Sequence, residues 1–177
     1  MVMKNLILLS VLLVTISSLA ATGKTKFTEA GIRAGMTKDE VTYTLAHRSA
    51  LSRFLFGGCT HPGTDRQYLC KYDGNKGDYV RVFFLHSNPV MWENDPMVGF
   101  AMTVHYEGSF SQSWKLWYDD ISKQLGSAPT KQENNPDEYT LKHAEWIVRD
   151  ARGKQVEKVR LDAMTGREIM IFYDVSQ

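Results

Sequence analysis

The first hydrophobic feature of the chain is a mostly apolar run over residues 6–16, which follows a single positive charge at Lys4. Small residues stand at Ser18 and Ala20, which are the two positions that a signal peptidase recognises. A membrane-spanning helix needs about 20 apolar residues, so the run is too short for the alternative, a membrane anchor. We therefore expect residues 1–20 to be a secretory signal peptide and the mature protein to be periplasmic or secreted.

The next segment shows the spacing of a helix. The Thr37 hydroxyl is suited to accept a hydrogen bond from a first-turn amide, and Glu40 stands three residues later, which completes a capping box. Val41 and Leu45 follow on one helical face. The pattern predicts a helix from Thr37 to about His47, whereas residues 49–56 fit either an extension of it or a separate short turn.

Alternation with a period of two follows. Residues 67–72 and 79–85 are rich in aromatic and β-branched side chains, which predicts two strands joined by a turn at 74–77. In residues 98–106 the even positions from 100 carry Phe, Met, Val and Tyr, and the odd positions from 101 carry Ala, Thr and His. This pattern predicts a half-buried strand.

The second half of the chain begins with another helical pattern, over residues 113–125. One apolar stripe is formed by Trp114, Trp117, Ile121 and Leu125. Gly126 is a natural C-cap and ends the predicted helix. Three more strands are expected at 144–149, 157–162 and 168–175, with hairpin turns at 151–154 and 165–166.

This order predicts an α+β fold of two tandem repeats, over residues 21–108 and 109–177. Each repeat is expected to hold one helix and an antiparallel sheet of three or four strands. The two sheets are expected to join edge to edge into one sheet with both helices on the same side, so that the apolar face is buried.

Composition narrows the range of partners. The formal net charge is +1 and no basic cluster occurs, which argues against electrostatic binding to nucleic acid or to anionic lipid. After residue 16 no segment is apolar for long enough to cross a membrane. We expect the partner to be another exported or envelope protein, with no nucleic acid, no stable membrane insertion and no cofactor.

Cys59 and Cys70 are the two cysteines of the chain. In an oxidising compartment such a pair favours a disulfide, which would stabilise the fold by about 3 kcal/mol. The alternatives are a reactive thiol or a metal site. A metal site has weak support, because His61 is the one other ligand type close by and structural zinc takes four ligands.

Several motifs of the first half resemble those of the β-lactamase inhibitory protein family. They are Lys26-Phe27-Thr28, Gly35-Met36-Thr37 with Val41, the pair Cys59 and Cys70, and Gly77-Asp78-Tyr79. The Gly-Met-Thr element and the helix ending at Gly126 also resemble the BamE-type proteins of outer-membrane assembly. The second half lacks the Gly-Met-Thr opening and a second cysteine pair.

The resemblance implies a fold of two helix-plus-sheet repeats and a role in binding another protein. We expect an exported protein-binding module that inhibits a periplasmic or secreted enzyme. The alternative is a BamE-like assembly or scaffolding factor of the cell envelope. No contact residue of either family is carried over to this chain.

Candidate catalytic residues are few. Asp119 and Asp120 are neighbours on the predicted helix and do not face each other, so a carboxylate pair is not expected, and Asp119 is expected to pair with Lys123. We expect His105 to be an ordinary exposed position of its strand; the alternative is an acid-base pair with Glu107 if a pocket surrounds them. No nucleophile elbow, zinc motif or phosphate-binding loop occurs, so we do not expect an enzyme.

Binding residues have better candidates. Met91 and Trp92 lie in a loop between prolines, and a large aromatic side chain on a loop is a common interface anchor. The alternative is that Trp92 folds back over the edge of the core. Arg81, His105 and Arg160 are expected on the polar face of the sheet, as is Lys158. This face either is solvated or receives the partner.

Overall fold

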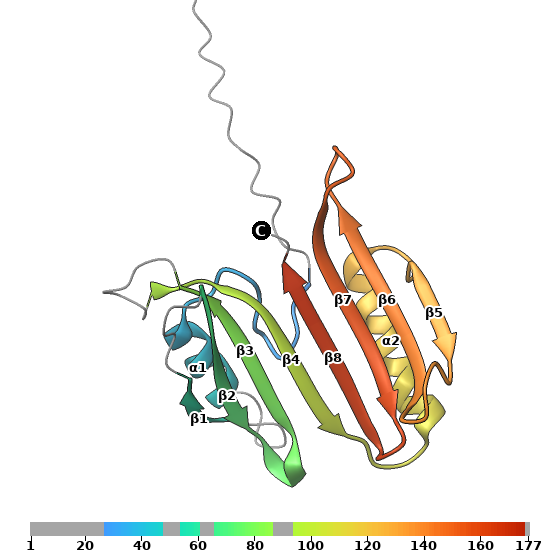
Figure 1. The fold of residues 1–177 in the computed structure, drawn as a ribbon. Helices are drawn as coiled ribbons and strands as arrows, with labels where there is room; N and C mark the ends of the chain where they lie inside the picture. Colours follow the sequence, from blue (N-terminus) through green and yellow to red (C-terminus); the bar gives the residue numbers. More distant parts are fainter. Residues whose placement is uncertain (1–26, 48–53, 61–65, 87–93, 176–177) are drawn as a thin grey trace, which may run out of the picture.

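The computed structural model describes residues 27–47, 54–60, 66–86 and 94–175, which form two helices and one sheet (Figure 1). The helices are α1 (Lys38–Ala46) and α2 (Phe110–Leu125), and a 3-10 turn, η1, spans Asn75–Gly77. The strands are β1 (Leu55–Cys59), β2 (Gln67–Asp73), β3 (Tyr79–Leu85), β4 (Met97–His105), β5 (Lys131–Asn134), β6 (Thr140–Arg149), β7 (Gln155–Met164) and β8 (Glu168–Val175). The predicted signal peptide lies outside the described residues.

The eight strands form one open antiparallel sheet in the order β1-β2-β3-β4-β8-β7-β6-β5. The predicted α+β class and the joining of two half-sheets edge to edge are therefore confirmed, with β4 and β8 as the pair at the seam. Both edge strands were missed. Leu55–Cys59 is a strand rather than a helix extension and loop, and Lys131–Asn134 is a strand without apolar alternation.

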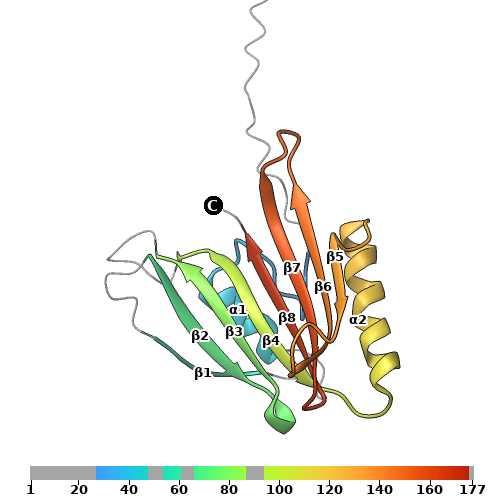
Figure 2. The ribbon, with the colours of Figure 1, turned by 45° about the vertical axis from the view of Figure 1, so that its right-hand side comes forward.

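Both helices pack on the same face of the sheet, α1 behind the first four strands and α2 behind the last four (Figures 1 and 2). The capping box of α1 is confirmed, because the Thr37 hydroxyl accepts from the Glu40 amide and the Glu40 carboxylate accepts from the Thr37 amide. Trp114, Ile121 and Leu125 of α2 are buried as expected. Gly126 ends that helix in the left-handed conformation, with φ of 70°.

The N-terminal segment completes the core on the helix-covered face. Phe27 is fully buried, and its ring lies 6.2 Å from the ring of Phe100 on β4 and 5.4 Å from that of Tyr173 on β8. Its backbone amide donates to the buried carboxylate of Glu157 on β7. Phe27 therefore bridges the seam and ties the two half-sheets into one hydrophobic core.

Strand β4 is more buried than predicted. Ala101 and Thr103, which were expected on a solvated face, are 9% and 1% exposed. The reason is position: β4 lies in the middle of the sheet, so longer side chains from its neighbours cover these small ones. Gly99 is required at the seam, because a Cβ atom there would lie 2.5 Å from the Tyr173 carbonyl oxygen.

A disulfide joins Cys59 and Cys70, as the sequence predicted. The two residues are directly opposite each other on β1 and β2, with their Cα atoms 4.0 Å apart. The bond holds the five-residue edge strand β1 to the rest of the sheet, and Cys70 is fully buried against the core.

Candidate functional site

The face of the sheet that carries no helix, called here the open face, is the surface seen in Figure 1. Because side chains alternate along each strand, residues in register form rows across it. The central row runs from β2 to β5 through Lys71, Arg81, Ala101, Phe172, Arg160, Glu145 and Lys131. Arg81, His105 and Arg160 therefore share one face, as the alternation predicted.

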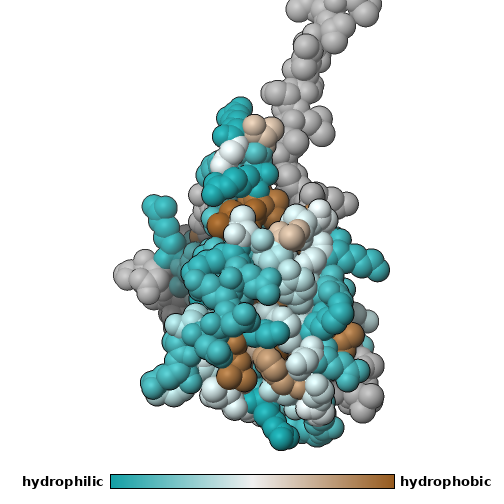
Figure 3. Space-filling model, turned by 90° about the vertical axis from the view of Figure 1, so that its right-hand side faces the viewer, coloured by the Kyte–Doolittle hydropathy of each residue, from teal (hydrophilic) through white to brown (hydrophobic). Residues whose placement is uncertain are grey.

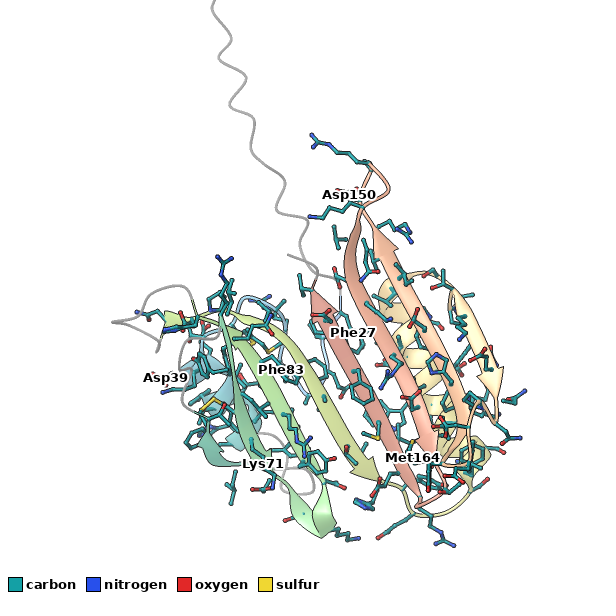
Figure 4. The ribbon with its side chains drawn as sticks, in the orientation of Figure 1. Phe27, Asp39, Lys71, Phe83, Asp150 and Met164 are labelled. Atoms are coloured by element: carbon teal, nitrogen blue, oxygen red, sulfur yellow. A yellow bond between two sulfur atoms is a disulfide. The ribbon has the colours of Figure 1, made fainter. Side chains whose placement is uncertain are left out.

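The middle of the open face is apolar. Leu69, Phe83, Met170 and Phe172 are half-buried there, and Figure 4 shows Phe83 near the centre of the first half-sheet. A hollow of about 240 Å³ lies over Gly99, with Phe83 and Phe172 among the residues that line it. The missing side chain of Gly99 thus leaves room between two aromatic rings at the seam.

Arginines lie beside this apolar centre. The guanidinium of Arg160 lies 3.9 Å from the ring centroid of Phe172, and its Nε is 2.9 Å from Asp162 Oδ2, an ion pair without aligned hydrogen-bond geometry. The guanidinium of Arg81 lies 5.1 Å from the ring centroid of Tyr79. Within the described residues, Arg81 has no carboxylate partner, so its charge is available to a second molecule.

His105 stands at the end of β4 between two carboxylates. Its Nδ1 is 3.0 Å from Asp78 Oδ1, and its Nε2 is 3.1 Å from Glu168 Oε1 on β8. The alternative of an acid-base pair with Glu107 is not what the structure shows, because β4 ends at His105 and Glu107 pairs with Lys76. Since both ring nitrogens are engaged, His105 holds the sheet end together, and no acid-base pair with Glu107 exists.

Two other predicted features can be placed. Asp119 pairs with Lys115, at 2.5 Å, rather than with Lys123, so its helical neighbour lies four residues before it. Met91 and Trp92 lie outside the described residues. Lys158 is on the open face as expected, where its Nζ is 2.6 Å from Glu145 Oε2.

The aromatic residues at the centre of the open face, Phe83 and Phe172, were missed by sequence reasoning. The signal was present in the alternation: Phe83 shares the odd positions of 79–85 with Tyr79 and Arg81, and Phe172 stands on the even positions of 168–175. Assigning them to the open face needed the registers Arg81 with Ala101 and Ala101 with Phe172, and pairing between distant strands cannot be derived from one sequence.

Two features do not occur in the described part of the chain, a cluster of His, Cys and carboxylate metal ligands and a membrane-spanning helix. No group of three His, Cys, Asp or Glu side chains that could hold a metal occurs among these residues. Neither α1 nor α2 combines the length and the apolar composition needed to cross a bilayer.

Comparisons of the chain with protein-family models, with curated proteins and with solved structures find no match. The resemblance to the β-lactamase inhibitory proteins and to the BamE-type proteins therefore rests on the sequence motifs and stays a prediction.

Proposed function

We propose that this chain is an exported protein-binding module whose open face receives another exported or envelope protein. One observation carries the proposal: an eight-stranded sheet is covered by helices on one face, while the other keeps half-buried aromatic side chains at its centre. Apolar sheet faces are normally buried against another layer. A partner protein supplies that layer in this proposal.

The composition of the open face supports a protein as the partner. Protein interfaces combine an aromatic centre with arginines and a polar rim. Phe83 and Phe172 form such a centre, Arg81 and Arg160 stack beside it on aromatic rings, and charged pairs such as Lys158 with Glu145 surround it. Because Arg81 has no carboxylate partner among the described residues, its charge favours a partner that presents a carboxylate opposite it.

The finer form of the proposal is inhibition of a periplasmic or secreted enzyme. The support is the motif resemblance, together with the order of one helix and four strands in each half of the chain, which fits a tandem repeat. Docking of the open face, aided by Met91 and Trp92, would block the cleft of the enzyme. Such inhibition needs no chemistry, so we propose no enzymatic activity for the chain.

The test is an affinity pull-down of exported proteins with the mature, oxidised chain as bait. We expect one stoichiometric partner, and we expect it to be lost with Arg81→Glu and with Phe83→Ala. Lys115→Glu is the matched control, because Lys115 lies on α2, on the other side of the sheet, and should leave capture unchanged.

One result would count against inhibition, and another would count against the docking surface. Recovery of outer-membrane assembly components would favour the BamE-like scaffold over the inhibitor. A partner captured equally well by both open-face variants would contradict the docking surface itself.

A further inference from the structure

A second hollow of about 430 Å³ opens on the same face, at the β6-β7-β8 end of the sheet. One imidazole and two thioethers line it: those of His143, Met164 and Met170. Figure 4 places Met164 at the end of β7, where the chain turns into β8. Imidazole and thioether are softer ligands than the carboxylates and amines that dominate protein surfaces.

Strand register brings these three side chains together. Asp162 on β7 is directly opposite His143 on β6 and Met170 on β8. Met164 lies two residues beyond Asp162 on the same face of β7, and it pairs with Thr140. Diagonal neighbours on one face are about 7–8 Å apart, within reach of side chains of this length.

His143 is already oriented as a metal ligand would be. Its Nδ1 lies 2.7 Å from Asp162 Oδ1, and a carboxylate accepts, so in the neutral imidazole this contact places the proton on Nδ1 and leaves the lone pair on Nε2. Within the described residues Nε2 has no hydrogen-bond partner. A carboxylate on the far nitrogen is the usual way in which proteins fix a metal-binding imidazole.

The sulfur atoms also keep lone pairs. Met164 Sδ is 3.7 Å from the Thr140 hydroxyl, but that hydroxyl also lies 3.0 Å from Asp137 Oδ2, a stronger acceptor. Both cysteines are in the disulfide, so no thiol competes for a soft metal.

The charges around the hollow suit a monovalent cation. Lys131 and Arg160 bring two positive charges, and Glu133, Asp137 and Asp162 bring three negative ones, so the excess is one negative charge while His143 is neutral. Hydrogen bonds from the Tyr139 and Thr140 amides lower the pKa of Asp137, which keeps this carboxylate ionised.

We propose that His143, Met164 and Met170 form a binding site for a soft monovalent metal ion, and that this ion is Cu(I). His143 binds through Nε2 and the methionines through Sδ, while Asp162 holds the imidazole in place. The site does not depend on the proposed docking of a protein.

The test is anaerobic titration of the oxidised protein with Cu(I) against a chromophoric chelator. We expect one equivalent to bind, with at least a tenfold loss of affinity in Met164→Leu/Met170→Leu and in His143→Gln. Leucine keeps the methionine volume, so the double variant should fold, which a urea curve verifies. His105→Gln is the control, because His105 likewise has a carboxylate beside its Nδ1 but does not line the hollow.

X-ray absorption of the Cu(I)-loaded protein should show sulfur as well as nitrogen neighbours. The proposal is overturned if no stoichiometric Cu(I) binds, if the double methionine variant binds as tightly as the unaltered protein, or if the spectrum shows no sulfur.

Discussion

Adjacent residues of one strand have different roles, because they lie on opposite faces of the sheet. On β8, Ile171 is fully buried under the helices, whereas Phe172 is half-buried on the open face beside the Arg160 guanidinium. The helix-covered face holds the contiguous core that includes Phe27 and Trp146. Burial there drives folding, whereas the open face keeps apolar area that folding leaves unburied.

Electrostatics differ between the faces as well. The open face carries local pairs such as Lys71 with Asp73 and Lys158 with Glu145. Exposed pairs of this kind contribute about 0–1 kcal/mol to stability, so they set the polarity of the surface more than its stability. Buried polar groups on the helix-covered face, such as Glu157, instead bond to the backbone and fix the position of a segment.

The largest contrast should come from alanine substitution at the two neighbours on β8. Ile171→Ala should lower the free energy of unfolding by about 3–4 kcal/mol, because it opens a cavity in the core. Phe172→Ala should cost about 1 kcal/mol, since part of that side chain stays in water in the folded state. Urea unfolding followed by circular dichroism measures both, and equal losses would refute the distinction between the faces.

The disulfide should matter to stability and leave the open face intact. Replacing Cys59 and Cys70 with alanine should cost about 3 kcal/mol, mainly because the unfolded chain gains freedom. The melting temperature of the double variant, compared with that of the oxidised unaltered protein, gives the effect. The expectation is contradicted if the double variant is fully unfolded, or if it is folded but no longer binds Cu(I). Either result would show that attaching β1 stabilises strands beyond the edge of the sheet.

A third substitution tests how closely β4 and β8 pack at the seam. Gly99→Ala should cost about 2 kcal/mol, because the added Cβ meets the Tyr173 carbonyl oxygen at 2.5 Å and forces β4 and β8 apart. At Gly166 the nearest atom to such a Cβ is 3.9 Å away, so Gly166→Ala is the matched control and should change stability by less than about 0.5 kcal/mol. Similar losses at both sites would argue against a tight seam.

The smallest effect should appear at alkaline pH, on the helix-covered face. Burial, with a smaller contribution from Asp95, raises the pKa of Tyr68 from 10.0 to about 12. Since the folded pKa is above the unfolded one, this contribution to stability is complete below pH 10 and is lost as pH rises towards 12.

Absorbance titration of tyrosinate should therefore show a late-ionising group that disappears in Tyr68→Phe. Stability that stays flat between pH 10 and 12 in the unaltered protein would contradict this assignment.

Much of the fold was predictable from the sequence. The helix α1 was marked by its capping box and α2 by its stripe, and strands β3 and β8 were marked by their aromatic and β-branched runs. The edge strands were not predictable for opposite reasons. Strand β1 contains Gly57 and Gly58, which indicate a loop, and β5 is polar throughout because an edge strand contributes little to the core.

The candidate sites were predictable in part. Alternation alone assigned Arg81, His105 and Arg160 to one face, but the partners of His105 come from a turn and from a strand 63 residues away (168 − 105). The cluster of His143, Met164 and Met170 depends on the β6-β7-β8 register in the same way. Figure 3 shows the side with α2 and β5, where hydrophilic side chains predominate.

The most direct test of the docking surface is hydroxyl-radical footprinting of the oxidised protein, alone and with its captured partner. We predict protection of Tyr79, Phe83 and Phe172 on the open face, and unchanged labelling of Leu116 on α2, which is 66% exposed. Protection of Leu116 with unchanged labelling of Phe83 and Phe172 would contradict the account, because the partner would then bind the helices instead.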